Sequence, residues 1–209
     1  MNTTVNDKED KNVKSFIQQT SCIILAGGKS TRMQTNKALL KIHDIYFIDF
    51  LYYILLNSGF KNIYISGNLD NYKCIPDSDN TSGPVGAIFS CLKYLENKPC
   101  TNLFFFSVDA PLITINIIFQ LIKYFEEHSC VYFENLMLPF ITKKDALAKI
   151  YYSRDKFNLH AIKDILINLN AKYKQVTADE NFIIKGVNTK EEYFNYIKIL
   201  GEKNDTKFL

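Results

Sequence analysis

The sequence lacks the patterns that mark several common protein classes. Its five cysteines are scattered and never arranged as Cys-x-x-Cys, which argues against a disulfide framework or a structural zinc site. No window approaches the roughly 18–20 apolar residues of a membrane span. The N-terminal segment also lacks the apolar core of a secretory signal. These absences favour a cytoplasmic protein that carries free buried thiols and does not contact a membrane.

The net charge is small, and candidate nucleophiles are sparse. The net charge is only +3, which does not favour nucleic-acid binding. The three histidines share no spacing and form no Ser/His/Asp arrangement, so no covalent nucleophile stands out. The basic residues are almost all lysine, with Arg32 and Arg154 as the two arginines. An arginine inside a candidate loop is therefore more noticeable than usual.

The domain organisation is predicted to be simple. The chain has 209 residues, 47% of them hydrophobic, enough for one domain with a sizeable core. Residues 1–20 are polar and predict a disordered leader. Residues 21–201 are expected to form a single domain, and residues 202–209 a flexible tail.

Apolar segments alternate between short runs typical of buried strands and longer stretches with helical spacing. Strands are predicted within 22–27, 61–68, 102–109, 130–135, 137–142 and 172–176. Helices are predicted within 45–60, 85–95, 114–128, 143–152, 158–169 and 189–200. This alternation predicts an α/β fold with a mostly parallel central sheet and helices on both faces. Ligands bind such sheets outside the carboxyl ends of the strands, which selects the loops after residues 26, 67, 76 and 108.

The loop after the first predicted strand reads "AGGKSTRMQTNK". Gly27 and Gly28 would let a phosphate approach the backbone closely, and Lys29, Arg32 and Lys37 could neutralise the charge of a triphosphate. The spacing matches neither the Walker pattern nor Gly-x-Gly-x-x-Gly. From these residues alone, a phosphate-binding loop and a tight turn with solvated basic residues are equally good interpretations.

Two further loops carry acidic residues. Asp109 ends a strongly apolar strand, "NLFFFSVD", where an unpaired buried carboxylate would be costly. Mg²⁺ would balance it, although a turn aspartate is the alternative. The loop "PDSDNTSGPVGAI" contains Asp77, Asp79 and Gly83. It could contact a base or a ribose, or it could be an ordinary surface turn.

Taken in order, these loops resemble a known family. "LAGGKSTRM…NKALL", "TSGPVGAI" and "FFFSVDAPL" resemble the molybdenum cofactor guanylyltransferases, the MobA family. The late "GVNTKEEY" is similar to that family's N-x-N-T-P-x-x motif, and the resemblance spans about residues 21–200. The first and third motifs are shared by nucleotidyltransferases that activate sugars, isoprenoid precursors or cobalamin intermediates. The GP-x-x-G loop and the late Asn-Thr make the molybdenum enzymes the closer match.

The resemblance implies a Rossmann-like nucleotidyltransferase that uses Mg²⁺. It would transfer GMP from GTP to the phosphate of molybdopterin cofactor, giving the guanine dinucleotide cofactor and pyrophosphate. GTP and molybdopterin cofactor are the expected partners, with molybdoenzymes or cofactor-delivery proteins as further candidates. One alternative is another nucleotidyltransferase, using CTP or a sugar- or isoprenoid-phosphate acceptor. The other is a nucleotide-binding protein without transfer activity.

The resemblance also assigns roles to individual residues. It places the nucleotide at Leu25, Ala26, Gly27, Gly28, Lys37, Asp77, Gly83 and Asp109. Its catalytic set is Arg32 and Lys37 at the phosphates and Asp109, which would also hold Mg²⁺. Asn188 would lie toward the pterin acceptor.

The chain departs from the family pattern at several positions. Gln34 and Asn36 replace a glycine and an aspartate of the family's Met-Gly-x-Asp-Lys, and Asp44 replaces a glycine. Gly186 replaces the first asparagine of the late motif, and Lys190 replaces its proline. These changes leave the expected phosphate and metal residues in place and bear mainly on the identity of the acceptor.

Overall fold

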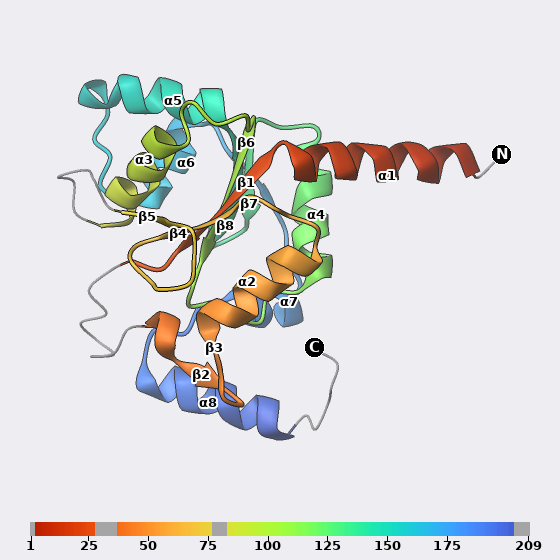
Figure 1. The fold of residues 1–209 in the computed structure, drawn as a ribbon, viewed down its shortest axis with the longest axis vertical. Coiled ribbons are helices and arrows are strands. Elements are labelled where there is room, and N and C mark those ends of the chain that lie inside the picture. Colours follow the sequence, from red (N-terminus) through yellow and green to blue (C-terminus); the bar gives the residue numbers. More distant parts are fainter. Residues whose placement is uncertain (1–2, 28–36, 77–82, 203–209) are drawn as a thin grey trace.

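The structure, a computed structural model, describes residues 3–27, 37–76 and 83–202 (Figure 1). In chain order its elements are α1 (Thr3–Gln18), β1 (Thr20–Leu25), η1 (Lys37–Leu39), β2 (Lys41–Ile42), β3 (Ile45–Tyr46), α2 (Phe47–Asn57), β4 (Ile63–Ser66), β5 (Cys74–Ile75), α3 (Pro84–Tyr94), β6 (Asn102–Ser107), α4 (Ile115–Phe125), β7 (Cys130–Phe133), β8 (Leu136–Lys143), α5 (Lys144–Tyr152), η2 (Arg154–Lys156), α6 (Ile162–Asn168), β9 (Lys172–Lys174), α7 (Ala178–Ile184) and α8 (Lys190–Glu202). Within these ranges, no helix is long and apolar enough to cross a bilayer.

A seven-stranded sheet of order β5-β4-β1-β6-β8-β7-β9 runs through the described residues. Strand β8 is antiparallel to both of its neighbours, and the other adjacent strands pair in parallel. Helices α2 and α4 cover one face, while α3, α5 and α6 cover the other (Figure 1). The predicted α/β architecture with a mostly parallel sheet is confirmed.

Strand β6 shows why the central strands are almost continuously apolar. Phe104 and Phe106 pack into the core cluster beneath α2 and α4, whereas Leu103 and Phe105 pack into the cluster beneath α3, α5 and α6. Successive side chains point to opposite faces of a sheet, and here both faces are buried. Polar side chains are therefore confined to the strand ends, where the expected site lies.

The strand register brings three of the candidate loops together. Leu25 at the end of β1 pairs with Ser66 of β4 on one side and Ser107 of β6 on the other. Beyond the strands, the amide of Val108 donates to the carbonyl of Leu25 at 3.2 Å. Strands that end in register deliver the loops after β1, β4 and β6 to one edge of the sheet.

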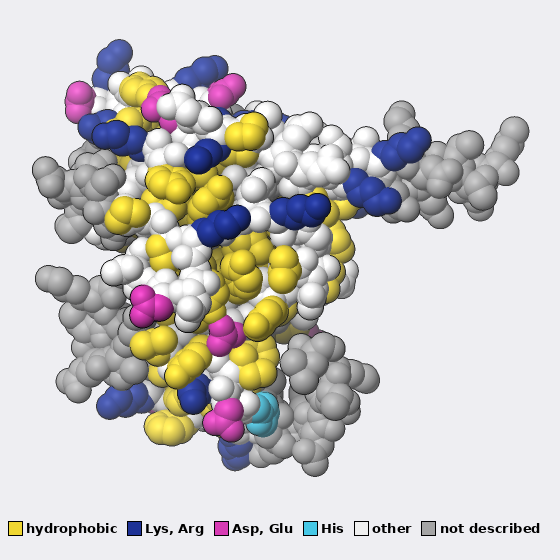
Figure 2. Space-filling model, in the orientation of Figure 1, with side chains coloured by type: hydrophobic (Ala, Val, Ile, Leu, Met, Phe, Trp, Pro, Cys, Tyr) yellow, Lys and Arg dark blue, Asp and Glu magenta, His cyan; other side chains and the backbone are white. Residues whose placement is uncertain are grey.

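Helix α2 is apolar on both its buried and its exposed sides. Leu51 and Leu55 are fully buried, whereas Tyr53 and Leu56 are 57% and 46% exposed. Figure 2 shows apolar side chains gathered over this part of the molecule.

A short hairpin, β2–β3, follows the first loop and was not expected from the sequence. Its two turn residues, His43 and Asp44, have φ values of 47° and 68°. Two consecutive residues with positive φ are typical of the tight turn that suits a β-hairpin. Asp44 therefore adopts a backbone conformation in which glycine is common and aspartate is tolerated.

The hairpin holds α8 in place. The Tyr193 hydroxyl donates to the carbonyl of Lys41 at 2.8 Å. Ile42 and Phe47 share a small buried cluster with Tyr196 of α8. The segment that follows Lys37 is thus packed against the helix that follows Asn188.

The prediction of a disordered leader differs from the structure, in which α1 extends away from the sheet (Figure 1). Val13, Phe16 and Ile17 have the i, i+3, i+4 spacing of an apolar helix face. Phe16 and Ile17 pack against the core, and the Phe16 ring lies 5.6 Å from that of Phe125. Contact with the core thus outweighs the polar composition. Of the predicted tail, residues 203–209 lie outside the described residues.

The predicted free thiols are present. None of the five cysteines forms a disulfide: Cys22, Cys91, Cys100 and Cys130 are buried, and Cys74 is half-buried. Burial raises the pKa of the Cys22 thiol well above its usual value and that of Cys130 to about 12. These thiols therefore belong to the core rather than to a reactive site.

Candidate active site

Lys37, Asp109 and Asn188 meet at the carboxyl edge of the sheet. The Nζ atom of Lys37 lies 2.8 Å from Oδ2 of Asp109 and 2.8 Å from Oδ1 of Asn188. The side chains of Lys37 and Asp109 are 17% and 18% exposed, so water reaches this ion pair only partly. The structure thus brings together three residues to which the resemblance assigned phosphate, metal and acceptor roles. We refer to these three residues as the Lys37 cluster.

The carboxylate of Asp109 is held from several sides. The Ser107 hydroxyl donates to Oδ1 at 2.6 Å, while Lys37 donates to Oδ2. The backbone amide of Val187 donates to the Asp109 carbonyl at 2.9 Å. Together these contacts fix both the side chain and the backbone of the residue expected to hold a cation.

Gly186 makes room for that carboxylate. A Cβ atom built at Gly186 would overlap Oδ1 and Cγ of Asp109. The family pattern has asparagine at this position, and the space that an asparagine side chain would need is here filled in part by the Asp109 side chain. Gly186 also lies between the Lys37 cluster and the segment that leads into α8.

The N-terminus of α8 positions Asn188. Oε2 of Glu192 accepts from the amides of Asn188 at 2.7 Å and Thr189 at 3.1 Å, and the Thr189 hydroxyl accepts from the Glu192 amide at 3.1 Å. This reciprocal pattern is a capping box. The amide of Asn188 lowers the pKa of Glu192; burial opposes this shift, and Thr189 and Lys185 add smaller lowering effects. The charge of Glu192 thus holds the backbone on which Asn188 sits.

The exit of β1 carries the described part of the predicted nucleotide loop. The Leu25 side chain is buried in the core, so only its backbone can face a ligand, whereas Ala26 is half-buried and Gly27 is exposed. Gly67, at φ 133°, lies against Gly27: a Cβ there would be 3.6 Å from the Gly27 nitrogen. The segments that follow β1 and β4 are therefore in contact at this edge of the sheet.

The remaining predicted site residues are placed only in part. Gly83 is exposed at the N-cap of α3 with φ 93°, a backbone conformation that favours glycine. The other residues predicted here, Gly28, Arg32 and Asp77, lie outside the described residues, as do the departures Gln34 and Asn36.

The oxygen atoms of the Lys37 cluster, together with that of the neighbouring Ser107, fit a hard cation bound together with phosphate. Within the part of the chain that the structure describes, no three His, Cys, Asp or Glu residues gather as a closed metal site. Asp109, Ser107 and Asn188 instead offer carboxylate, hydroxyl and amide oxygens close together. Mg²⁺ typically takes one or two protein carboxylates and completes its shell with water and phosphate oxygens.

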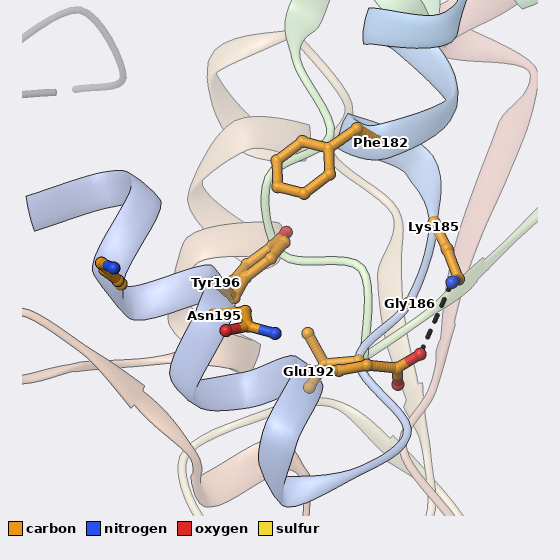
Figure 3. A pocket seen from close by; sticks show the side chains of 8 residues that line it. Phe182, Lys185, Gly186, Glu192, Asn195 and Tyr196 are labelled. Carbon is orange, nitrogen blue, oxygen red and sulfur yellow. Dashed lines mark ion pairs between the residues drawn. The ribbon is translucent and has the colours of Figure 1, made fainter. Parts of the chain in front are cut away.

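A pocket of about 480 Å³, which we call the α7–α8 pocket, is formed by α7, α8 and the segment between them (Figure 3). It is lined by Phe182, Lys185, Gly186, Val187, Glu192, Asn195, Tyr196 and Lys198. Its wall includes an ion pair between Lys185 Nζ and Glu192 Oε1 at 3.5 Å. Gly186 belongs to the pocket wall and also abuts Asp109, so the pocket and the cluster are neighbours.

Sequence reasoning missed Ser107, Glu192 and Tyr196. Ser107 lies two residues before Asp109, as expected for a polar residue at a strand end. The spacing of Thr189 and Glu192 is a capping-box signal that could have been found. No sequence pattern indicates a role for Tyr196, because its position depends on how α8 packs against the rest of the fold.

Comparison with known proteins gives a consistent picture. The chain is 30% identical over 186 residues to the probable molybdenum cofactor guanylyltransferase of Flavobacterium johnsoniae, covering 84% of this chain and 95% of that protein. It is 28% identical over 178 residues to the molybdenum cofactor guanylyltransferase of Xanthomonas euvesicatoria, covering 84% and 93%.

A solved structure shares the fold. The molybdopterin-guanine dinucleotide biosynthesis protein A of Archaeoglobus fulgidus superimposes with a TM-score of 0.68 at 14% identity, covering 87% of this chain and 99% of that one. Residues 22–172 match the MobA-like NTP transferase domain family. The chain therefore belongs to the MobA-like NTP transferase domain family, as its resemblance implied.

Proposed function

We propose that this protein transfers GMP from GTP to the phosphate of molybdopterin cofactor, forming the guanine dinucleotide cofactor and pyrophosphate. Relatives that cover most of the chain are named molybdenum cofactor guanylyltransferases. The observation that carries the proposal is the Lys37 cluster, which joins a lysine, a carboxylate and an amide at the end of β1 and β6. This is the sheet edge at which nucleotides bind in related folds.

In this reaction the protein needs no covalent nucleophile. An oxygen of the acceptor phosphate attacks the α-phosphorus of GTP and forms a new P–O bond. The bond between the α-phosphorus and the bridging oxygen breaks, and pyrophosphate leaves with that oxygen. Catalysis of such a transfer consists mainly of alignment and charge stabilisation. The partly buried charges of Lys37 and Asp109 are suited to both tasks.

Lys37 and Asp109 would divide these tasks between them. Asp109 would hold Mg²⁺, and the bound ion would neutralise negative charge on the phosphates. Lys37 would exchange the Asp109 and Asn188 oxygens for phosphate oxygens, a charge-assisted contact. Ser107 would keep one carboxylate oxygen oriented, as it does in the structure at 2.6 Å. Asn188, released from Lys37, would be available to the acceptor.

A transfer assay tests the proposal. Purified protein is incubated with GTP, Mg²⁺ and molybdopterin cofactor, and the dinucleotide product and pyrophosphate are quantified. Parallel thermal-shift measurements with GTP, CTP, UTP and ATP identify the donor, because a ligand at about 100 times its Kd stabilises by about 2.7 kcal/mol. GTP is expected to give the largest shift. Transfer from CTP but not GTP would refute the proposal.

A further inference from the structure

A second pocket, which we call the α1–α2 pocket, lies at the opposite edge of the sheet from the Lys37 cluster. It has a volume of about 560 Å³ and is lined by residues of α1, α4, the end of α2 and the segment that joins α2 to β4. Gln18 and Asn62 of its wall stand just before the first residues of β1 and β4. The pocket is therefore at the amino ends of these parallel strands. Among the described residues that line it, none belongs to the expected nucleotide site.

The wall of this pocket combines apolar side chains with two cations. Val13 and Ile17 of α1 and Phe119 of α4 supply apolar surface, and all three are half-buried. Lys14 and Lys61 supply the charge, and both are exposed. None of the described residues in the lining is acidic. A cavity of this size can hold a small ligand or the side chain of a bound protein.

The two lysines of the α1–α2 pocket have no partner of their own. Among the residues whose side chains the structure describes, neither Lys14 nor Lys61 makes an ion pair or a hydrogen bond. Lys37 and Lys185, by contrast, each pair with a carboxylate. Two unpaired cations beside apolar surface attract an anion that also carries an apolar group. The pocket therefore suits an occupant that is both acidic and amphipathic.

The apolar surface continues out of the pocket along α2. Tyr53, Leu56 and Asn57 have the i, i+3, i+4 spacing of one helix face, and Asn57 lines the pocket. Tyr53 and Leu56 are 57% and 46% exposed. Figure 2 shows basic side chains between the N-terminal helix and the apolar side chains over α2. A small ligand would fill the pocket and leave this stripe uncovered, whereas an extended protein segment would cover both.

We propose that the α1–α2 pocket and the exposed face of α2 bind an acidic amphipathic segment of a partner protein. One apolar side chain of the segment enters the pocket, and its carboxylates lie beside Lys14 and Lys61. A groove that accepts the apolar face of a helix is a common mode of peptide recognition, and such interfaces depend on a few buried anchors. This inference goes beyond the proposed function and does not depend on it.

Fluorescence anisotropy with a labelled model peptide tests the surface. The probe is a helical peptide of about 20 residues with leucine on one face and glutamate on the rest. We expect saturable binding to the full-length protein that weakens as salt is added. Lys14→Glu combined with Lys61→Glu should raise Kd at least about tenfold, and Leu56→Ser about fivefold. Wild-type affinity in both variants would overturn the proposal.

Matched variants on the opposite face of the sheet separate this surface from a general charge effect. Lys149→Glu combined with Lys163→Glu makes the same change in net charge at exposed positions of α5 and α6. Ile167→Ser removes an apolar side chain that is 64% exposed on α6. Both should bind the probe like wild type, and an equal loss of affinity would overturn the proposal. If charge reversal lowers Tm, Lys14→Ala and Lys61→Ala are measured singly, and each should still weaken binding.

Two further probes identify other occupants of this surface. Sedimentation should find the protein monomeric at the concentrations used for anisotropy. A dimer that dissociates in the Lys14→Glu and Lys61→Glu variant would place a second copy on the surface. Binding to phosphatidylglycerol vesicles that is lost in the same variant would place a lipid surface there. Either result overturns the proposal, and neither measurement uses GMP transfer, so the outcome stands apart from the proposed function.

Discussion

The Nζ atom of Lys37 contacts Asp109 and Asn188, which lie 72 and 151 residues further along the chain, at 2.8 Å each. One cation therefore ties together the segment after β1, the end of β6 and the start of α8. A carboxylate engaged by Lys37 is not fully available to a metal ion. Phosphate oxygens that draw Lys37 away would release Asp109 and Asn188 together, so nucleotide binding and metal binding should be coupled.

Asp109→Asn removes the only formal negative charge in the Lys37 cluster and preserves its shape. We expect kcat for GMP transfer to fall by at least about a hundredfold, because an amide is a poor ligand for Mg²⁺ and carries no charge. Tm should change little, since the Ser107 contact survives. Steady-state kinetics across a Mg²⁺ series checks this. Asp145→Asn, at an exposed position in α5, is the control and should retain full activity.

Lys37→Ala should raise the GTP KM and lower kcat, each about tenfold or more. A partly buried cation that contacts phosphate interacts with both the ground state and the transition state. GTP titration by calorimetry and steady-state kinetics separate the two effects. Lys41→Ala is the comparison, because Lys41 is exposed and its Nζ lies 4.9 Å over the Tyr46 ring. Equal kinetics for wild type and Lys37→Ala would remove Lys37 from the site.

The parallel core of the fold could be predicted because its signals are local. Apolar runs such as that of β6 give strands, and Thr114 is a recognisable N-cap whose hydroxyl accepts from Ile117 at 3.3 Å. The edge of the sheet at which Asp109 and Gly27 lie then follows from strand order. Their proximity to Asn188 could not be derived this way, because it depends on how α8 packs.

The features that were missed depend on tertiary contacts. The α1 helix has a polar composition and gains its contact with the core through Phe16 and Ile17. The hairpin turn at His43 and Asp44 lacks the usual glycine, so the sequence of this segment does not indicate a hairpin. In the sequence, Gly186 is only a departure from a motif. The structure shows that a glycine at this position leaves room for the Asp109 carboxylate.

Gly186→Ala should displace the Asp109 carboxylate, because the new methyl group would overlap it. We expect kcat to fall about tenfold and the free energy of unfolding to fall by about 1–3 kcal/mol, as for overpacking. Enzyme kinetics and urea unfolding measure these changes. The matched control is Lys190→Ala, at an exposed position four residues further on.

A double-mutant cycle tests whether the Gly186→Ala effect passes through Asp109. In an Asp109→Ala background the carboxylate is gone, so Gly186→Ala should cost little additional stability. The coupling free energy between the two positions should be about as large as the single Gly186→Ala cost. Additive costs would mean that Gly186 matters for its own backbone rather than for Asp109.

The capping box at α8 should make the stability of the site depend on pH. The pKa of Glu192 in the folded protein is lowered from an ordinary value of 4.5, mainly by the amide of Asn188. A carboxyl whose folded pKa is lowered contributes stability above its unfolded pKa, and this contribution disappears as the pH falls through the folded pKa.

We therefore expect Glu192→Gln to be less stable than wild type at pH 7, by about 0.5 kcal/mol because the side chain is 37% exposed and screened by water. The difference should shrink below pH 4.5 and vanish at lower pH. Urea unfolding at a series of pH values measures it, with Glu191→Gln, an exposed neighbour in the same helical turn, as the control. A difference that stays constant from pH 7 to pH 3 would show that the contribution of Glu192 is packing rather than charge, and Asn188 would then be held by its backbone geometry alone.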